Sequence, residues 1–342
     1  MDMRQAIARV VEGRSLAEPE MEQVMRLIMT GGATPAQIAG FLVALRLKGE
    51  TVEELAAAAR VMRELASRVE VPPERLVDTC GTGGDASGTF NISTAAALVA
   101  AAAGARVAKH GNRAVSGRSG SADLLEAAGV RLDLPPEAVG RCIREVGVGF
   151  LFAPAHHGAM RHAIGPRREL GVRTLFNLLG PLTNPAGAPH QVLGVFDARW
   201  VEPLAEVARR LGARRVLVVH GLDGLDEISL GAPTEVAEVA EGELRRYRIR
   251  PEALGLEPAP LEALRAGSVA ESLARVEEAL ADRPGPARDV VALNAGAALY
   301  AAGVAEDLRE GLERAREAIA SGAARAKLEE LAAYSRRAGG QA

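Results

Sequence analysis

A change of pattern near residue 71 constrains the fold of this chain more than any other feature. Before it, residues 1–68 carry only the helical spacing of apolar side chains. After it, short apolar runs alternate with helical stretches, which is typical of an α/β domain with a largely parallel sheet. The runs are 76–80, 106–109, 148–152, 191–196 and 215–219. We therefore expect the α/β class, with a small all-helical domain and a larger α/β domain that has a mostly parallel central sheet.

The same pattern suggests how the chain divides into domains. We expect residues 1–70 to form the small helical domain, and residues 71–164 and 188–342 to form the large domain. Residues 165–187 interrupt the alternation with turn signals, beginning at Gly165-Pro166, and are a candidate to cross back to the helical domain.

Local signals refine this outline. Ser15-Leu-Ala-Glu18 and Thr51-Val-Glu-Glu54 both match the capping box, in which a hydroxyl caps the first turn and a glutamate reaches back to the cap. Residues 234–239 and 244–249 predict a hairpin-like excursion, and helices return from about 269 to 337.

Composition excludes several classes of protein. Aromatic residues make up only 3% of the chain and the net charge is -3, so we expect no nucleic-acid partner. The longest apolar run, 95–103, is too short to span a bilayer, and no secretory signal follows Met1. Two cysteines, Cys80 and Cys142, form neither a disulfide framework nor a zinc pattern, so we expect a cytoplasmic protein.

The glycine-rich segment Asp78-Thr-Cys-Gly-Thr-Gly-Gly-Asp85 is the first candidate for chemistry. It follows a predicted strand and precedes a helix that opens at Asn91-Ile-Ser-Thr94. Glycines let backbone N–H groups approach a ligand closely, and a helix N-terminus attracts anions. The segment is neither a Walker loop nor a dinucleotide fingerprint. Taken alone, it is compatible with a plain turn as well as with an anion site.

A second strand, loop and helix follows. Lys109 ends the strand, at the edge where open α/β sheets place their ligands. Lysine occurs only at positions 48, 109 and 327, so a lysine here indicates a need for a compact ammonium group. We expect His110 to be a satisfied loop histidine rather than a catalyst. Neutral polar contacts for a ribose phosphate would come from Asn112, Ser116, Ser119 and Ser121.

Adjacent carboxylates at Asp226 and Glu227 follow the strand 215–219. Hard oxygen ligands in small number suit Mg²⁺, which keeps some of its waters and binds through substrate phosphates. A solvated acidic turn is the alternative. The phosphate-type loops elsewhere favour the metal, because a diphosphate site needs its charge neutralised.

With these segments together, the chain resembles the anthranilate phosphoribosyltransferases of tryptophan biosynthesis over nearly its whole length. The matching segments are 36–46, 78–85, 90–94, 109–113, 173–185 and 224–228. The resemblance implies the fold of the type II nucleoside phosphorylase group, with substrates between the domains and a homodimer joined through the helical domains. It also implies transfer of the 5-phosphoribosyl group of phosphoribosyl diphosphate to the amine of anthranilate, with release of diphosphate.

The resemblance further assigns roles to residues. Lys109 is the expected catalytic residue, because its charge would meet that of the leaving diphosphate. Ser93, Asp226 and Glu227 match Mg²⁺-linked positions. Gly81, Asn112 and Arg167 match anthranilate contacts, with Arg167 a natural partner for the carboxylate. The implied substrate-binding set is Gly81, Gly84, Asp85, Thr89, Asn91, Ile92, Ser93, Thr94, Lys109, His110, Gly111, Asn112, Arg113, Ser116, Gly117, Ser121 and Arg167.

The chain departs from the family pattern at Gly158 and at Gly165-Pro166, both on the anthranilate side. Two other functions stay open at this point. A pyrimidine nucleoside phosphorylase shares the fold and the phosphate loops, and a nucleic-acid-binding relative shares the fold without transferase activity. Residues 91–94 and the pair Asp226-Glu227 favour the transferase, and the net charge of -3 disfavours nucleic acid.

Overall fold

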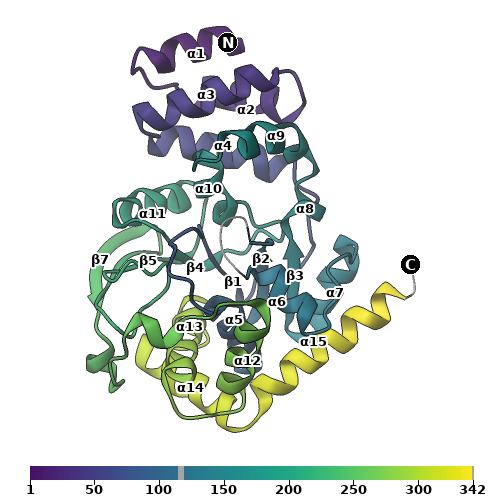
Figure 1. Cartoon of the computed structure of the whole chain (residues 1–342), viewed down its shortest axis with the longest axis vertical. Helices are drawn as coiled ribbons and strands as arrows, with labels where there is room; N and C mark the ends of the chain where they lie inside the picture. The colour runs from purple at the N-terminus through teal and green to yellow at the C-terminus, as the bar shows by residue number, and fades with distance from the viewer. Residues whose placement is uncertain (115–118, 341–342) are drawn as a thin grey trace.

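The computed structural model describes residues 1–114 and 119–340, and it has two parts (Figure 1). The first part is a bundle of helices, and the second is built around a seven-stranded sheet. The bundle consists of α1 (Met3–Val11), α2 (Glu18–Met29), α3 (Pro35–Lys48) and α4 (Val52–Glu64). The predicted α/β class, with a small helical part before a larger α/β part, is confirmed.

The sheet has the strand order β3-β2-β1-β4-β5-β6-β7. Its first five strands in this order are parallel, and β6 and β7 form an antiparallel hairpin at one edge. All seven strands lie where the sequence predicts them. They are β1 (Leu76–Gly81), β2 (Arg106–Gly111), β3 (Val148–Phe152), β4 (His190–Gly194), β5 (Arg215–Gly221), β6 (Thr234–Ala240) and β7 (Glu243–Ile249).

The strand order places a topological switch point between β1 and β4, which we call the β1–β4 crevice. These strands are neighbours, but the chain leaves β1 toward β2 on one side and leaves β4 toward β5 on the other. The connections after the two strands therefore diverge at their carboxyl ends, which is where open α/β sheets bind ligands. The glycine-rich segment begins at the end of β1, directly in this position.

Alternating side chains bury both faces of the sheet. Val77 and Val219 pack toward α5 (Ile92–Ala102) and α13 (Pro286–Ala301), whereas Leu76 packs toward α7 (Pro136–Val146) on the opposite face. The remaining helices of this part are α6 (Ser121–Ala127), α11 (Val201–Arg210), α12 (Val269–Leu280), α14 (Leu308–Ala320) and α15 (Ala323–Gly339).

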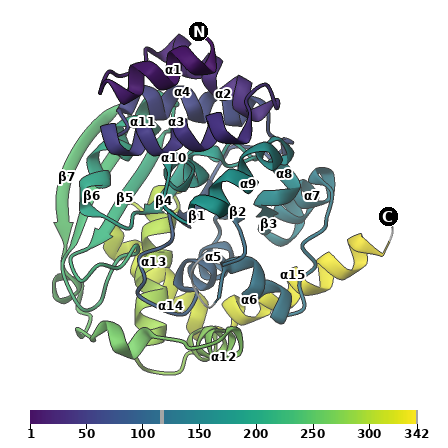
Figure 2. The same cartoon turned by 45° about the horizontal axis from the view of Figure 1, so that its top comes forward.

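Three short helices connect the two parts of the molecule. They are α8 (Ala153–His156), α9 (Arg161–Leu170) and α10 (Leu175–Leu179). Helix α9 packs on α2 and α3, and α10 packs on α3 and α4. Figures 1 and 2 both place α9 and α10 between the bundle and the sheet. We propose that this segment belongs with the helical domain.

One prediction for this segment is wrong. The sequence suggests a turn at Gly165-Pro166, but both residues lie inside α9. Pro166 is buried together with Ala163 on the same side of the helix. Packing against the bundle has therefore overridden the local preference of proline to end a helix.

The two parts also share an apolar core. One cluster of buried side chains runs from α1–α4 through α10 and α11 to the sheet residues Val216 and Val218. Arg63 of α4 is half-buried at this seam and donates 2.6 and 3.3 Å hydrogen bonds to the carbonyls of Leu182 and Leu211. Burial lowers the pKa of Arg63 to about 10.

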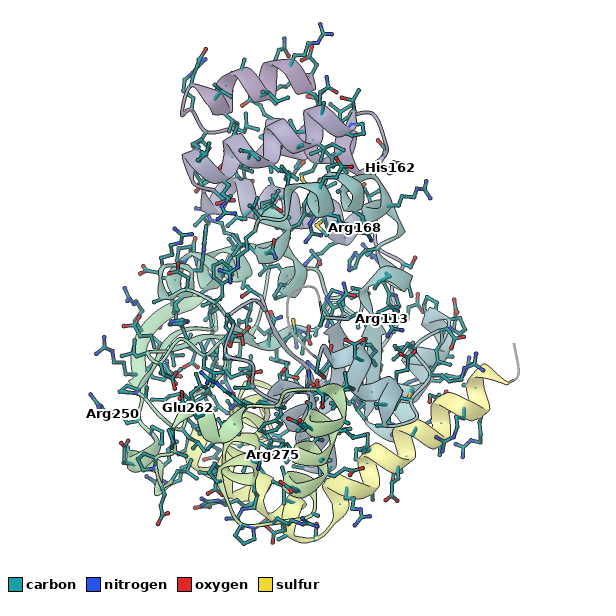
Figure 3. The ribbon with its side chains drawn as sticks, viewed as in Figure 1. Arg113, His162, Arg168, Arg250, Glu262 and Arg275 are labelled. Carbon is teal, nitrogen blue, oxygen red and sulfur yellow. The ribbon has the colours of Figure 1, made fainter. Side chains whose placement is uncertain are left out.

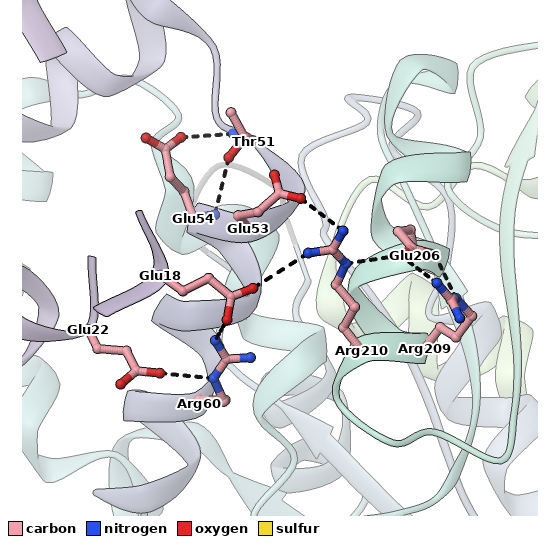
Figure 4. Close-up of polar contacts among 9 residues, drawn as sticks. All are labelled: Glu18, Glu22, Thr51, Glu53, Glu54, Arg60, Glu206, Arg209 and Arg210. Atoms are coloured by element: carbon pink, nitrogen blue, oxygen red, sulfur yellow. Dashed lines mark hydrogen bonds and ion pairs between the residues drawn. The ribbon is translucent and has the colours of Figure 1, made fainter. Parts of the chain in front are cut away.

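Ion pairs line the outside of the same seam (Figure 4). Arg210 of α11 reaches Glu18 of α2 at 3.5 Å and Glu53 of α4 at 2.8 Å. Arg60 of α4 pairs with Glu18 and with Glu22, at 2.5 and 3.0 Å. Helices α2, α4 and α11 are thereby linked by charge as well as by packing.

Of the two predicted capping boxes, one is correct. Thr51 caps α4, and its hydroxyl accepts the N–H of Glu54 at 3.2 Å while Glu54 accepts the N–H of Thr51 at 2.9 Å. The Ser15 box is wrong, because α2 begins at Glu18 after an Ala17 cap. The Ser15 hydroxyl instead accepts a hydrogen bond from Lys48 at 3.2 Å, a contact between distant segments.

Candidate active site

The glycine loop after β1 is held in the crevice from two sides. Thr82 N–H donates to the Gly194 carbonyl at 2.8 Å, and Gly83 N–H donates to Asp226 Oδ2 at 3.0 Å. Gly81 makes this packing possible, because a Cβ added there would lie 2.8 Å from Asp226 Oδ2. The loop thus bends around an acidic side chain that comes from a distant part of the sequence.

The N-terminus of α5 faces the same place. Asn91 precedes the helix at the N-cap position, and its side chain makes no cap hydrogen bond but accepts from the hydroxyls of Ser119 at 2.8 Å and Ser272 at 2.7 Å. Ser93 N–H donates to Glu227 Oε1 at 3.2 Å. The Thr94 hydroxyl is buried and has no partner among the described residues. Ser93 and Glu227 are therefore adjacent, as a shared metal site requires.

Two further predicted contacts are less direct. The Ile92 side chain is buried in the main core, so only its backbone is available to a ligand. Thr89 lies in the loop before α5, where its hydroxyl is 3.3 Å from that of Ser87.

Lys109 lies buried on β2 between acidic groups. Its ammonium donates to the Thr79 carbonyl, and it reaches the Ser93 hydroxyl at 3.4 Å. Asp78 is buried beside it and accepts the N–H of His110 at 3.1 Å. Burial raises the pKa of Asp78, and the charge of Lys109 opposes that shift. Lys109 therefore places a buried ammonium group beside Asp78 and Glu227.

Three carboxylates meet beside the glycine loop. Asp226 N–H donates to Asp85 Oδ2 at 3.4 Å, and Glu227 follows Asp226 in the chain. Desolvation raises the pKa of Asp226, and the negative charges of Asp85 and Glu227 add to the shift. Burial likewise raises the pKa of Glu227, against the lowering effect of Lys109. Carboxylates that raise each other's pKa in this way form an environment that a cation would relieve.

These residues fit Mg²⁺ by their chemistry. Among residues 1–114 and 119–340, no group of three or more His, Cys, Asp or Glu side chains is arranged to hold a metal ion unaided. Mg²⁺ needs few protein ligands when substrate phosphates supply the others, and Asp226, Glu227 and the Ser93 hydroxyl are such a small set of oxygens.

The segment after Lys109 contributes polar groups at the edge of the site. Gly111 ends β2, and Asn112 and Arg113 follow it exposed. The Asn112 carbonyl accepts from the Ser121 hydroxyl at 3.3 Å. Arg113 pairs with Asp123 at 3.1 Å and with Glu126 at 2.7 Å, so its charge is already matched within the α/β part (Figure 3). Ser116 and Gly117 lie outside the described residues.

His110 differs from its prediction as a satisfied loop histidine. It is part of β2 and buried, and its Nε2 has no partner among the described residues. Its ring lies 5.2 Å from that of His157, whose Nε2 is also buried and unpartnered. Burial lowers the pKa of His110 to about 3 and that of His157 to about 4. His157 was not among the predicted site residues. The one sequence feature that could have pointed to it is its position beside Gly158, where the chain departs from the family pattern.

Arg167 on α9 has an unpaired guanidinium. It lies 5.2 Å from the centre of the Phe176 ring. Within the described parts of the chain, it makes no hydrogen bond or ion pair through its side chain, and burial lowers its pKa. Arg167 belongs to α9, which packs on α2 and α3 of the bundle and carries the labelled His162 and Arg168 of Figure 3.

The two departures from the family pattern meet no obstacle. A Cβ added at Gly158 or at Gly165 would have no atom within 4 Å. Either position therefore has room for a Cβ.

The fold and site define a class of protein. The helical bundle domain of a glycosyl transferase family matches residues 4–66, and the a/b domain of that family matches residues 73–325. The chain thus has both domains of this glycosyl transferase family, with the glycine loop, Lys109 and the carboxylates all in the second.

Relatives then identify the family more narrowly. Anthranilate phosphoribosyltransferase of Thioalkalivibrio sulfidiphilus is 67% identical over 334 residues, which are 98% of this chain and 99% of that protein. The crystal structure of the Thermus thermophilus enzyme of the same name is 54% identical, with a TM-score of 0.92 over 97% of this chain and 99% of that one. The Saccharomyces cerevisiae enzyme in complex with PRPP and Mg is 26% identical, with a TM-score of 0.88 over 98% of each chain. The chain belongs to the anthranilate phosphoribosyltransferase family. These names agree with the predicted transferase and not with the phosphorylase or nucleic-acid-binding alternatives.

Proposed function

We propose that this chain transfers the 5-phosphoribosyl group of phosphoribosyl diphosphate to the amine of anthranilate, forming N-(5-phosphoribosyl)anthranilate and diphosphate in tryptophan biosynthesis. The observation that carries the proposal is the group of Asp85, Asp226, Glu227 and Lys109 around the glycine loop at the β1–β4 crevice. This combination suits a multiply charged phosphate ligand accompanied by a cation.

The diphosphate half of the site is assigned to the glycine loop and the start of α5. Backbone N–H groups of a loop and a helix N-terminus bind phosphate oxygens without adding charge. Lys109 would meet the negative charge that develops on the leaving diphosphate. A preorganised donor of this kind is worth on the order of 10²–10³ in rate.

We assign Mg²⁺ to Asp226, Glu227 and Ser93. When bound, the ion would supply the charge neutralisation that a diphosphate leaving group requires. The protein's own contribution is to keep these oxygens close together, with Ser93 N–H donating to Glu227 and Gly83 N–H donating to Asp226.

The acceptor half is assigned to Arg167, Asn112 and the histidine pair. The Arg167 guanidinium has no hydrogen-bond or ion-pair partner among residues 1–114 and 119–340, and it suits a carboxylate through a paired hydrogen bond. His110 and His157 stay neutral at physiological pH because burial lowers the pKa of each. Each has a buried Nε2 that no described residue bonds, and a ligand would satisfy it. An aromatic amine is largely unprotonated near neutral pH, so the reaction needs no strong general base.

We also propose a homodimer joined through the helical part, in the cytoplasm. Val11 of α1 is 69% exposed and Leu47 of α3 is 83% exposed, and these two helices pack together. A contiguous exposed apolar patch marks an interface, and the dimer proposal requires that these two side chains belong to one. No helix in the described residues is long and apolar enough to cross a membrane. Light scattering should report twice the mass of one chain, and a monomeric mass at micromolar concentration would contradict the dimer.

The test of the reaction is the loss of anthranilate fluorescence when phosphoribosyl diphosphate and Mg²⁺ are added. We expect loss only when both are present. Formation of a ribose phosphate from nucleoside and phosphate, without any change in anthranilate, would instead support a phosphorylase.

A further inference from the structure

Arg173 connects the helical part to the glycine loop. It lies between α9 and α10, and its guanidinium donates to the Gly84 carbonyl. The same guanidinium stacks over the Phe196 ring, 4.1 Å from its centre. The Arg173 carbonyl in turn accepts from Arg46 of α3 at 2.7 Å. Arg173 is thus held by the bundle through its backbone and contacts the diphosphate loop through its side chain.

The loop is shaped to receive this arginine. Gly84 has a φ of +77°, and a Cβ placed there would lie 3.3 Å from both Nε and Nη2 of Arg173. Phe196, the stacking partner, is itself tied to the loop, because its N–H donates to the Thr82 hydroxyl at 3.1 Å. Arg173 therefore contacts Gly84 directly and also stacks on Phe196, which is hydrogen-bonded to Thr82 of the same loop. These contacts fix the orientation of its guanidinium, which an ordinary surface arginine does not have.

Fixing the Gly84 carbonyl also fixes the next N–H. In a trans peptide the C=O and the following N–H point in opposite directions. Because the Gly84 carbonyl points at Arg173, the Asp85 N–H points away from Arg173. That N–H has no acceptor within residues 1–114 and 119–340. On the other flank of the loop, Gly83 N–H is already taken by Asp226.

We propose that Arg173 is a positioning residue that orients the Gly84–Asp85 peptide so that the Asp85 N–H is presented to the diphosphate of phosphoribosyl diphosphate. The proposal rests on the proposed function, because it deepens the role of the same glycine loop. Arg173 itself does not touch the reacting atoms; it acts through the peptide it holds.

The test compares Arg173→Ala with Arg199→Ala as a matched control. Arg199 also stacks on an aromatic ring, 5.4 Å from the centre of Trp200, and it has no contact with the glycine loop. We expect Arg173→Ala to raise the KM for phosphoribosyl diphosphate about tenfold, the loss typical of one hydrogen bond to a charged group. The KM for anthranilate and the melting temperature should change little. Arg199→Ala should match the wild type in both KM values, in kcat and in melting temperature.

Two further measurements separate positioning from a structural role. Arg173→Lys keeps one donor and should recover part of the KM, and millimolar guanidinium should do the same for Arg173→Ala but not for Arg199→Ala. Calorimetry with inorganic diphosphate and Mg²⁺ should show about tenfold weaker binding to Arg173→Ala. Equal binding and equal KM in Arg173→Ala and wild type would overturn the inference. The inference would also be overturned if Arg173→Ala had a lower melting temperature and a lower kcat but unchanged KM values for both substrates.

The outcomes also distinguish this inference from the proposed function. If wild-type protein did not convert anthranilate, the proposed reaction would fail, but diphosphate binding would still test Arg173. If wild-type protein were active and Arg173→Ala bound diphosphate equally well, only the inference would fail.

Discussion

A buried ion pair in the helical part offers a sharp test of what holds this fold together. Lys48 and Glu54 lie 2.9 Å apart with side-chain exposures of 5% and 0%. Lys48 also donates to the Gly49 carbonyl at 2.6 Å and to the Ser15 hydroxyl at 3.2 Å. Glu54 further accepts the N–H of Leu16 at 2.9 Å. The pair therefore joins the loop before α2 to the end of α3 and the start of α4.

The perturbation is Lys48→Met, which keeps the apolar stem and removes the charge. It leaves a buried carboxylate whose remaining partners are the backbone N–H groups of Leu16 and Thr51. Removing one partner of a buried pair costs about 3–5 kcal/mol, and the two remaining hydrogen bonds favour the lower end, about 3 kcal/mol. Adding Glu54→Gln to this variant removes the unpaired charge and should recover about 1 kcal/mol or more.

Urea unfolding followed by circular dichroism measures these changes. The matched control is Lys327→Met, because Lys327 pairs with Glu330 at 2.6 Å on the surface, where the glutamate is 51% exposed. That variant should lose no more than about 0.5 kcal/mol. The reasoning is refuted if Lys48→Met loses less than about 1 kcal/mol, or no more than Lys327→Met, or if Glu54→Gln makes the loss worse.

Three further predictions concern the site. Gly81→Ala should lower kcat/KM at least tenfold in the fluorescence assay, because its Cβ would lie 2.8 Å from Asp226 Oδ2. Unchanged kinetics would show that the loop shifts to accommodate the methyl group without loss of activity. Asp226→Asn with Glu227→Gln should lower activity and weaken its Mg²⁺ dependence, and a Mg²⁺ titration identical to that of the wild type would exclude these two residues as ligands. The folded-state pKa values of about 3 for His110 and about 4 for His157 lie below the ordinary value of 6.5, so the folded protein binds fewer protons than the unfolded chain. The free energy of unfolding should therefore fall as the pH drops below about 6.5, by about 2 kcal/mol per histidine at pH 5. His157→Gln should lose about 2 kcal/mol less than the wild type over that range, and equal losses would contradict the assignment.

Much of the fold could be predicted because its signals are local. The five parallel strands lie in short apolar runs, β6 and β7 lie in the predicted hairpin-like excursion, and the change from helical to alternating pattern near residue 71 marks the start of the sheet part. The wrong predictions have a common cause. Gly165-Pro166 is held in a helix by the bundle, Ser15 is taken by Lys48, and His110 is drawn into β2 beside His157. In each case a contact with a distant segment outweighed a local preference.

The candidate site divides in the same way. Sequence pattern and family resemblance selected the glycine loop, Lys109 and the pair Asp226-Glu227, since each lies at or shortly after the carboxyl end of a predicted strand. The order of the strands in the sheet could not be deduced from their spacing in the sequence, because it depends on which strands pair with one another.

The sequence by itself thus determined the elements of this protein and the chemistry that each one carries, because hydrophobic period, glycine and proline act within a few residues. Only the tertiary structure decided how those groups meet. Pairing of β1 with β4 opens the crevice, packing of α9 on α3 brings Arg173 to Gly84, and the close approach of Asp226 explains why position 81 has no side chain. These are contacts between segments up to about 150 residues apart, and their energies come from burial and charge pairing that no local window contains.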